Sequence, residues 1–547
     1  MRVLLLSMPD SFEHTPSLTM RMPNGALASL AGNVDRHHQV AIADLIVAQG
    51  SVRQTVERLV RELDPELVGL SVMTFQRHTA LEIVRLIREM KPDVQVVAGG
   101  YDPSLAPEAY EAPDSGVDFL VRGEGDLTFR DLLRAVERGG VESEIPGLSV
   151  RPSTQLPRAS REATSLRASQ PFRHGPPRHV SHLDGESIAL PNRAARVLTG
   201  YTFMGLGIDI VETSRGCTYD CSFCSIIEMR GRNFHTFDFT RVLADIADAR
   251  SRGARVIFIV DDNITLNVAR FEALCKAIVE AGFNDVQYLV QAMTSSIASH
   301  GETLSPLMRK AGFRYVFLGI ENILDEDLAF LRASAKNATR EGGRRTGNAT
   351  MRAIELLHRH GMYVVGGIIV GNPSDTKESI ETNLNFARRY VDWPYIQHPT
   401  PYPGTPMTKD FRERNLIVNE HMEEYDGTTA VVRSEHMSAN DIEFMRWRAE
   451  RWMKLRFLPT ALRFYPGFVM RHAPQMLAHT FRGSTWRSAV GLESSREVFA
   501  RYKAIRRRER DYLGEPPRYK RRPGPREKTP KIPLTSEAAA PSAPRPS

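Results

Sequence analysis

Apolar residues recur with two different periods in the first 150 residues. Short apolar runs predict buried strands, and stretches with apolar residues three or four positions apart predict helices between them. The predicted strands cover residues 3–6, 40–44, 67–72, 94–98 and 119–121. Strands that alternate with helices indicate a parallel sheet with right-handed crossovers. We therefore predict a Rossmann-like α/β domain over residues 1–150.

Glycines and small polar residues follow these predicted strands. They are Ser71, Met73, Thr74, Gly99, Gly100, Tyr101, Gly123, Glu124 and Gly125. Parallel sheets bind ligands beyond the carboxyl ends of their strands, and glycine lets the backbone approach a ligand closely. We therefore predict a site here for a large flat or phosphate-bearing ligand. No GxGxxG or GxxxxGK[ST] motif indicates a dinucleotide or a P-loop nucleotide.

A polar, proline-rich break at residues 151–199 predicts an extended linker along the surface. Six further strand-like runs follow, at residues 208–214, 256–260, 286–291, 315–320, 362–370 and 395–399. Repeated βα units predict a partial (β/α)6 barrel over residues 200–406, with its site at the carboxyl ends of the strands. Residues 407–520 have a mostly helical pattern. Residues 521–547 contain seven prolines and few apolar side chains, which predicts a disordered tail.

Three of the four cysteines lie close together, directly after the first predicted barrel strand. Cys217, Cys221 and Cys224 form a CxxxCxxC motif, with Phe223 before the last cysteine. Three thiolates at this spacing can hold one face of a soft-metal centre and leave one position open. A structural zinc site is the alternative, and it needs His235 or Cys275 as a fourth ligand. Neither lies in a paired metal-binding motif, and Cys275 has the spacing of a helix core residue.

The CxxxCxxC spacing and its aromatic residue resemble the radical SAM superfamily. In that superfamily, three cysteines bind a [4Fe-4S] cluster whose fourth iron binds S-adenosylmethionine (SAM). The resemblance implies that Cys217, Cys221 and Cys224 are the metal ligands and catalytic residues, with Phe223 in the cofactor site. It further implies that Asp262 and Asn263 contact the SAM amino group, Glu321 its ribose or carboxylate, and Gly371 its adenine. The alternative for each of these polar residues is a strand-end turn.

The N-terminal half resembles the cobalamin-binding domain that precedes the radical SAM domain in many such enzymes. The matching features are the turn at 23–26, the strand end at 69–71, Gly99 and Gly100 followed by Pro103, and the glycine turn at 123–125. The Asp-x-His-x-x-Gly motif is missing, so the resemblance implies cobalamin bound without a protein histidine on its lower face. An empty or repurposed domain is the alternative.

Within the superfamily, the chain is most similar to the hopanoid C-3 methylases, through residues 71–76, 99–104 and the basic region after 425–427. The resemblance implies that a 5'-deoxyadenosyl radical removes hydrogen from an unactivated carbon, which methylcobalamin then methylates. A second SAM restores the methyl group. The expected function is a C-methyltransferase for a hydrophobic substrate, a hopanoid lipid. The rivals are an oxidative cyclase similar to the anaerobic magnesium-porphyrin ester cyclases, and a non-enzymatic carrier of a cluster or cobalamin.

The net charge of +7 is uneven, because residues 446–522 are dense in arginine and lysine. With its interleaved aromatic residues, this region either lies on an anionic membrane surface or covers the barrel as a basic helical layer. We see no nucleic-acid recognition motif, no run of eighteen apolar residues and no signal peptide. Together with the few cysteines, this predicts a cytoplasmic protein, either free or at the inner membrane surface. A reductase such as flavodoxin or ferredoxin is the expected electron-donating partner.

Overall fold

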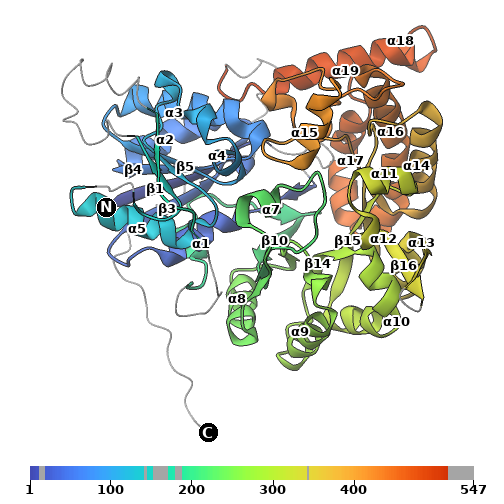
Figure 1. The fold of residues 1–547 in the computed structure, drawn as a ribbon, viewed down its shortest axis with the longest axis horizontal. Helices are drawn as coiled ribbons and strands as arrows, with labels where there is room; N and C mark the ends of the chain where they lie inside the picture. The colour runs from blue at the N-terminus through green and yellow to red at the C-terminus, as the bar shows by residue number, and fades with distance from the viewer. Residues whose placement is uncertain (11–18, 141–143, 152–170, 179–187, 342–343, 515–547) are drawn as a thin grey trace.

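The computed structural model describes residues 1–10, 19–140, 144–151, 171–178, 188–341 and 344–514. These residues form two largely parallel sheets and a helical C-terminal region (Figure 1). The predicted fold class is confirmed: a Rossmann-like sheet, a partial (β/α)6 barrel and C-terminal helices. The tail predicted to be disordered at 521–547 lies outside the described residues.

The first sheet has five parallel strands and two antiparallel ones at one edge. In spatial order they are β3 (Gln39–Asp44), β1 (Arg2–Ser7), β4 (Leu67–Ser71), β5 (Gln95–Gly99), β6 (Phe119–Val121), β7 (Leu148–Val150) and β8 (Arg173–His174). Counted along the chain, the parallel strands have the order 2-1-3-4-5, which is the flavodoxin-like arrangement. The order reverses between β1 and β4, and ligands of such sheets bind beyond the strand ends at that point.

Helices cover both faces of this sheet. They are α1 (Gly25–Asn33), α2 (Val52–Leu63), α3 (Arg77–Met90), α4 (Tyr101–Leu105) and α5 (Gly125–Glu137). Successive residues of a strand point to opposite faces. Leu4 of β1 therefore packs in one cluster with residues of α2 and α3, and Leu5 packs in another with residues of α1 and α5. The sheet is buried on both sides, which explains why its strands are apolar runs in the sequence.

The second sheet contains all six predicted barrel strands, parallel and in sequence order. They are β10 (Leu206–Val211), β13 (Val256–Ile259), β14 (Gln287–Met293), β15 (Phe313–Glu321), β18 (Tyr363–Ile369) and β19 (Trp393–Gln397). Two short antiparallel strands, β9 (Thr202–Phe203) and β2 (Met20–Arg21), extend the β10 edge. The sheet is open, because β19 and β2 are its two ends. The N-terminal region thus contributes a strand to the barrel sheet, which the sequence did not predict.

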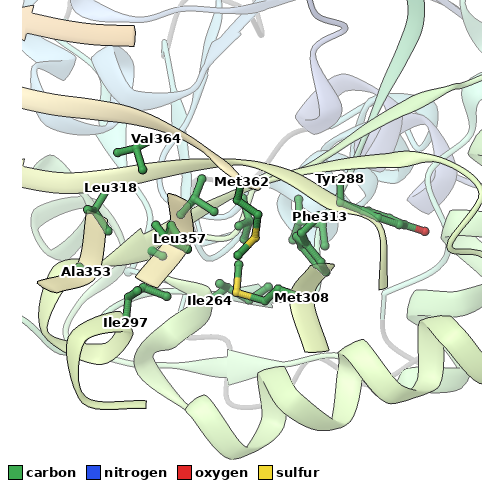
Figure 2. Packing of buried hydrophobic residues seen from close by; sticks show 14 of the residues in the cluster. Ile264, Tyr288, Ile297, Met308, Phe313, Leu318, Ala353, Leu357, Met362 and Val364 are labelled. Atoms are coloured by element: carbon green, nitrogen blue, oxygen red, sulfur yellow. The ribbon is translucent and has the colours of Figure 1, made fainter. Parts of the chain in front are cut away.

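A helical layer covers the outer face of the barrel sheet. It contains α8 (Phe239–Ser251), α9 (Val268–Glu280), α10 (Thr294–Ala311), α13 (Thr350–Arg359) and α14 (Lys377–Tyr390). Leu318 and Val364 of the strands pack with Ile297 of α10 and Leu357 of α13 (Figure 2). Cys275 of α9 is buried in the same core, as its spacing predicted.

In the segment predicted as a surface linker, several of the described residues are buried or paired with the two sheets. Strand β8 extends the first sheet, and Phe172 and Ile188 are buried in the cores of the first and second sheets. The buried Arg193 guanidinium donates to Asp245 Oδ1 of α8 (2.6 Å) and to Ile210 O of β10 (2.8 Å). The prediction was wrong for these parts, because a few apolar residues in a polar segment make long-range contacts. Residues 152–170 and 179–187 lie outside the described part.

The C-terminal region is built mainly from α-helices. They are α15 (Pro406–Glu413), α16 (Ala439–Phe464), α17 (Pro466–Thr480), α18 (Trp486–Ala489) and α19 (Ser495–Glu509). Tyr465 and Phe468, where α16 meets α17, share a buried cluster with Leu289 and Tyr315 of the strands. The neighbouring Val290 points to the helical outer layer instead. Helices α16 and α17 therefore close the inner side of the half-barrel.

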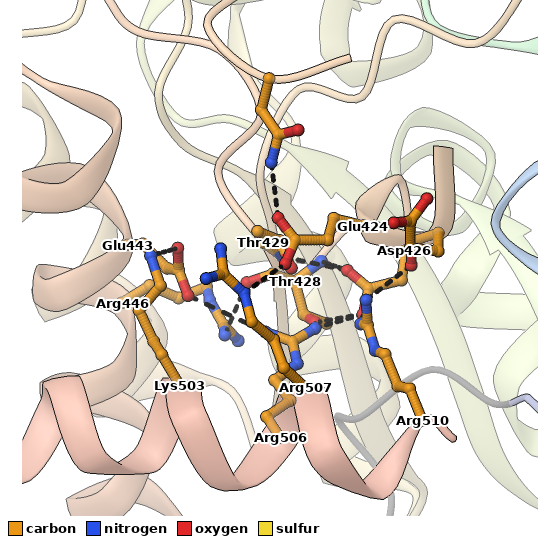
Figure 3. Close-up of polar contacts among 12 residues, drawn as sticks. Glu424, Asp426, Thr428, Thr429, Glu443, Arg446, Lys503, Arg506, Arg507 and Arg510 are labelled. Atoms are coloured by element: carbon orange, nitrogen blue, oxygen red, sulfur yellow. Dashed lines mark hydrogen bonds and ion pairs between the residues drawn. The ribbon is translucent and has the colours of Figure 1, made fainter. Parts of the chain in front are cut away.

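Helix α19 is fixed by a buried network of ion pairs (Figure 3). Arg506 and Arg510 both bind the Asp426 carboxylate, and Lys503 Nζ lies 3.0 Å from Glu443 Oε2. Burial would raise the pKa of Asp426, but the two guanidinium groups hold it far below its ordinary value. Beyond α19, Leu513 is buried in a core cluster of the first sheet. The C-terminal region thus contacts both sheets.

Candidate cofactor site

A cavity lies between the carboxyl edge of the first sheet and strands β10 and β13. Its wall includes Leu5 and Ser71 from β1 and β4, and Ile210 and Val260 from the barrel side. This is the point where the strand order of the first sheet reverses, so the cavity is where a ligand of such a sheet binds.

Nine of the predicted cofactor-binding residues line this cavity. They are Ser71, Met73, Gly99, Gly100, Tyr101, Gly123, Glu124, Gly125 and Asp262. Thr74 is buried at the start of the short helix η2 (Thr74–Gln76) and does not line it. The structure brings three strand ends of the first sheet together with one of the second. The role of each residue in binding stays a prediction.

The backbone at this edge is packed so closely that side chains would not fit. Gly100 has a φ of 104°, and a Cβ there would lie 2.8 Å from Val72 O. A Cβ on Gly25, at the start of α1, would lie 2.2 Å from Ile210 Cδ1. A wall of glycine backbone suits a large flat ligand, so the cavity fits the predicted corrin ring. No histidine lines it among the described residues.

The three cysteines lie in the loop between β11 (Ser214–Arg215) and α7 (Ser225–Arg230). Cys221 is buried, and Cys217 and Cys224 are half-buried. Burial, together with a smaller contribution from the neighbouring thiols, raises the pKa of Cys224 to about 12 and also raises that of Cys221. Thiols bind metals as thiolates, so metal binding here would release protons.

The spacing of the thiols favours a cluster over a single zinc ion. Sulfur ligands of one tetrahedral zinc lie about 3.8 Å apart, given Zn–S bonds of about 2.3 Å. We compared this with every group of three possible ligand atoms from His, Cys, Asp or Glu in the described part of the chain. Only the group of His37, His38 and Glu137 has all three atoms within 4.8 Å of one another. The three cysteine sulfurs therefore do not all lie within 4.8 Å of one another. They fit a multi-iron centre, and Cys275 is too deep in the core to complete a zinc site.

The strand end after β13 supports the cysteine loop. Asp262 Oδ2 accepts a hydrogen bond from Gly216 N (2.7 Å) and lies 3.2 Å from Arg230 Nη1. Asn263 is buried, and its Nδ2 has no hydrogen-bond partner among the described residues. A buried amide without a partner is costly. Asn263 therefore has a donor for a polar ligand, as the SAM prediction requires.

Glu321 lies near the cysteines together with a lysine that the sequence did not predict. Glu321 Oε1 accepts a hydrogen bond from Lys336 Nζ (2.9 Å). Burial would lower the pKa of Lys336, but Glu321 and the thiols of Cys221 and Cys224 raise it. Lys336 therefore places a positive charge beside the cysteine loop.

Phe223 and Gly371 have packing partners of their own. Phe223 packs against an apolar cluster that includes Leu331 and Phe411. A Cβ on Gly371, which has a φ of 105°, would lie 2.9 Å from Ile442 Cγ2 of α16. Close packing against α16 thus explains why position 371 is a glycine. Contact of Gly371 with adenine stays a prediction.

Arg215 joins the cysteine loop to the first sheet. Its Nη1 lies 2.9 Å from Glu124 Oε2 and 2.7 Å from Asp126 Oδ2, and its Nε lies 2.9 Å from Glu212 Oε2. Burial would raise the pKa of Asp126, but Arg215 beside it lowers it. Glu124, predicted as a cofactor contact, is thus an ion-pair partner. Only the position of Arg215 directly before Gly216 and Cys217 could have indicated its importance.

Tyr101 links the cavity to the cysteine loop. Its ring lines the cavity, and its helix α4 contacts α7, which follows Cys224. Burial raises the pKa of Tyr101, and the nearby Asp262 and Cys224 raise it further. The cavity and the cysteine loop are therefore adjacent.

Comparisons with known proteins agree with this geometry. Residues 17–133 match the B12 binding domain family, and residues 211–387 match the radical SAM superfamily. A radical SAM methyltransferase, TsrM from Kitasatospora setae, has been solved with cobalamin and a [4Fe-4S] cluster bound. It shares the fold, with a TM-score of 0.58 and 20% identity over 76% of this chain and 79% of that one.

Three curated relatives differ in their reactions. The chain is 24% identical to an uncharacterized methyltransferase of Pyrococcus horikoshii, over 88% of this chain and 99% of that protein. It is 26% identical to the hopanoid C-3 methylase of Methylococcus capsulatus, over 67% of this chain and 64% of that protein. It is 23% identical to the anaerobic magnesium-protoporphyrin IX monomethyl ester cyclase of Cereibacter sphaeroides, over 76% of this chain and 63% of that protein.

The two matched families identify cobalamin, a [4Fe-4S] cluster and SAM as the cofactors of this chain. The first family covers strands β3, β4, β5 and β6 of the first sheet, and the second covers the cysteine loop and strands β13, β14, β15 and β18 of the barrel sheet. The chain therefore combines a B12-binding domain with a radical SAM domain, and methyltransferases are among its relatives.

Proposed function

We propose that this enzyme is a C-methyltransferase that acts on an unactivated carbon of a hydrophobic substrate, a hopanoid lipid. The observation that carries the proposal is the shared wall of Tyr101 and Arg215 between the cavity and the cysteine loop. When bound, the cluster with SAM supplies a radical that removes hydrogen, and cobalamin supplies the methyl group. This wall would hold the sites of the two cofactors next to each other.

The protein's own residues hold the cofactors in line. The thiols of Cys217, Cys221 and Cys224 bind the cluster, and Asp262 fixes their loop through Gly216 N. The free donor of Asn263 and the pair of Glu321 with Lys336 bind the polar groups of SAM. The glycine backbone at the first sheet supports the corrin ring.

The inner face of the barrel sheet suits a hydrophobic substrate. Phe317 of β15 and Tyr395 of β19 lie there with ring centroids 5.4 Å apart. Both residues are only half-buried although they lie mid-strand. A flat apolar molecule could pack against such rings. The similarity to a hopanoid C-3 methylase supports a polycyclic lipid.

Oxidative cyclisation is the second candidate, since one curated relative is a magnesium-protoporphyrin ester cyclase. Methyl transfer forms S-adenosylhomocysteine, whereas cyclisation does not. Product analysis therefore separates the two reactions. In either case we propose a flavodoxin or ferredoxin as the electron donor and a membrane surface as the place where the enzyme meets a lipid.

Expression in a hopanoid-producing host that lacks this gene tests the substrate. We expect hopanoids heavier by one methylene group, with the new methyl labelled from labelled methionine. The Cys217→Ala variant serves as the control and should leave the lipids unchanged. Unchanged lipids with the wild-type chain, together with SAM turnover on a porphyrin or a peptide, would refute the hopanoid assignment.

A further inference from the structure

Large exposed apolar side chains gather in one part of the molecule. Most of the exposed large apolar side chains in the described part of the chain lie within residues 452–492. They are Trp452, Leu462, Phe464, Met470, Leu477, Phe481, Trp486, Val490 and Leu492. Scattered exposed apolar residues are ordinary, but a concentration of them marks an interaction surface.

Helix α17 has two apolar faces. Phe468 and Val469 are buried against the barrel strands. Met470 (76% exposed), Leu477 (44%) and Phe481 (40%) are seven and four positions apart, so they form one stripe on the solvent side. Helix α17 is therefore the layer that separates the closed inner side of the half-barrel from the exterior (Figure 1).

The stretch of chain that carries this stripe is positively charged. Residues 451–492 contain seven arginines and lysines and no aspartate or glutamate. Arg463 and Arg471 are exposed at the turn between α16 and α17, beside the exposed Leu462 and Phe464. A second copy of the chain would bring the same positive charge, so a dimer through this face is disfavoured. An anionic bilayer offers both negative charge and an apolar interior.

We propose that α17 and its turn with α16 dock on the surface of an anionic lipid bilayer. The helix lies in the interface with Met470, Leu477 and Phe481 inserted, and Arg463 and Arg471 contact the headgroups. No helix in the described ranges is long and apolar enough to cross a membrane, so the contact is peripheral. The relevance of docking rests on the proposed function, because it would bring the barrel next to a lipid substrate.

A groove beside the stripe offers room for part of a lipid. It runs between α16 and α17 and is lined by Leu455, Leu458, Met476 and Leu477, among others. Leu477 belongs to both the groove and the stripe. An acyl chain from the docked surface could therefore pass from the stripe to the groove along Leu477.

Cosedimentation of the full-length holoprotein with vesicles tests the proposal. We compare vesicles of phosphatidylglycerol and phosphatidylcholine with vesicles of phosphatidylcholine alone. The double variant Met470→Glu/Leu477→Glu should bind the anionic vesicles at least tenfold more weakly. Its matched control is Val418→Glu, since Val418 is 52% exposed elsewhere on the surface, and that variant should bind as the wild type does. Each of Arg463→Gln and Arg471→Gln should weaken binding about fivefold at low salt.

Equal binding by the wild type and the double variant would overturn the proposal, as would equal binding to both kinds of vesicle. A double variant that binds vesicles normally but changes from dimer to monomer in light scattering would assign the face to a second copy instead. Cobalamin content and cluster absorbance serve as the check on folding. Vesicle binding without lipid methylation would support docking and count against the hopanoid substrate. Methylation by a protein that binds no vesicles would overturn docking alone.

Discussion

Replacing Cys217, Cys221 or Cys224 by alanine is expected to abolish SAM cleavage and most of the cluster absorbance. Each change removes one of three thiolates that the centre requires, and no spare cysteine lies nearby to replace it. Cys275→Ala is the matched control, because Cys275 is buried in the barrel core among apolar side chains. It should cost about 1 kcal/mol of stability through a small cavity and leave the cluster intact.

The measurement is the iron content, visible absorbance and 5'-deoxyadenosine yield of each variant after anaerobic reconstitution. If the Cys275 variant lost its cluster as completely as the other three, the assignment of three ligands would be wrong. Normal SAM cleavage by the Cys217, Cys221 or Cys224 variant would contradict the account more directly.

Arg215→Met is expected to lower the free energy of unfolding by about 3–5 kcal/mol, because it leaves buried carboxylates without their partner. Glu124 and Asp126 come from the first sheet and Glu212 from the barrel, so the change removes the charge that joins them. The bound cobalamin should fall as well, since Arg215 and Glu124 line its cavity. Arg215→Lys should retain part of both properties, because lysine keeps the charge but not the forked geometry.

Arg232→Met is the matched control for this change. Arg232 pairs with Asp220 in the cysteine loop region, but both side chains are about half exposed. An exposed pair contributes about 0–1 kcal/mol, so this variant should unfold nearly as the wild type does. Denaturant titration and cobalamin content measure both variants. Equal stability of the Arg215 and Arg232 variants would show that the buried ion pairs of Arg215 do not stabilise the contact between the first sheet domain and the barrel.

The parallel strands could be predicted from the sequence because both sheets are covered on two faces. Such strands are continuous apolar runs, and all eleven predicted runs correspond to strands of the two sheets. Strands β2 and β9 have two residues each and no period to detect. The packing of Phe172 and Ile188 could not be predicted either, because composition does not reveal long-range contacts.

The strand-end residues of the site could be predicted for the same reason. Once the strands are known, topology brings their carboxyl ends to one edge, and nine predicted residues line one cavity there. The charged partners could not be predicted. Arg215 pairs with residues 91 and 89 positions earlier, and Lys336 approaches the cysteines from a short helix far along the chain. No local pattern encodes such pairs.

The central claim is methyl transfer by a radical SAM enzyme, and analysis of SAM-derived products tests it most directly. The anaerobically reconstituted holoprotein is incubated with SAM labelled in its methyl group, a reductant and hopanoid-containing vesicles. The account predicts that 5'-deoxyadenosine and S-adenosylhomocysteine both form, and that the labelled methyl group appears in the lipid. Formation of 5'-deoxyadenosine without S-adenosylhomocysteine, or unchanged SAM with a fully loaded cluster, would contradict it.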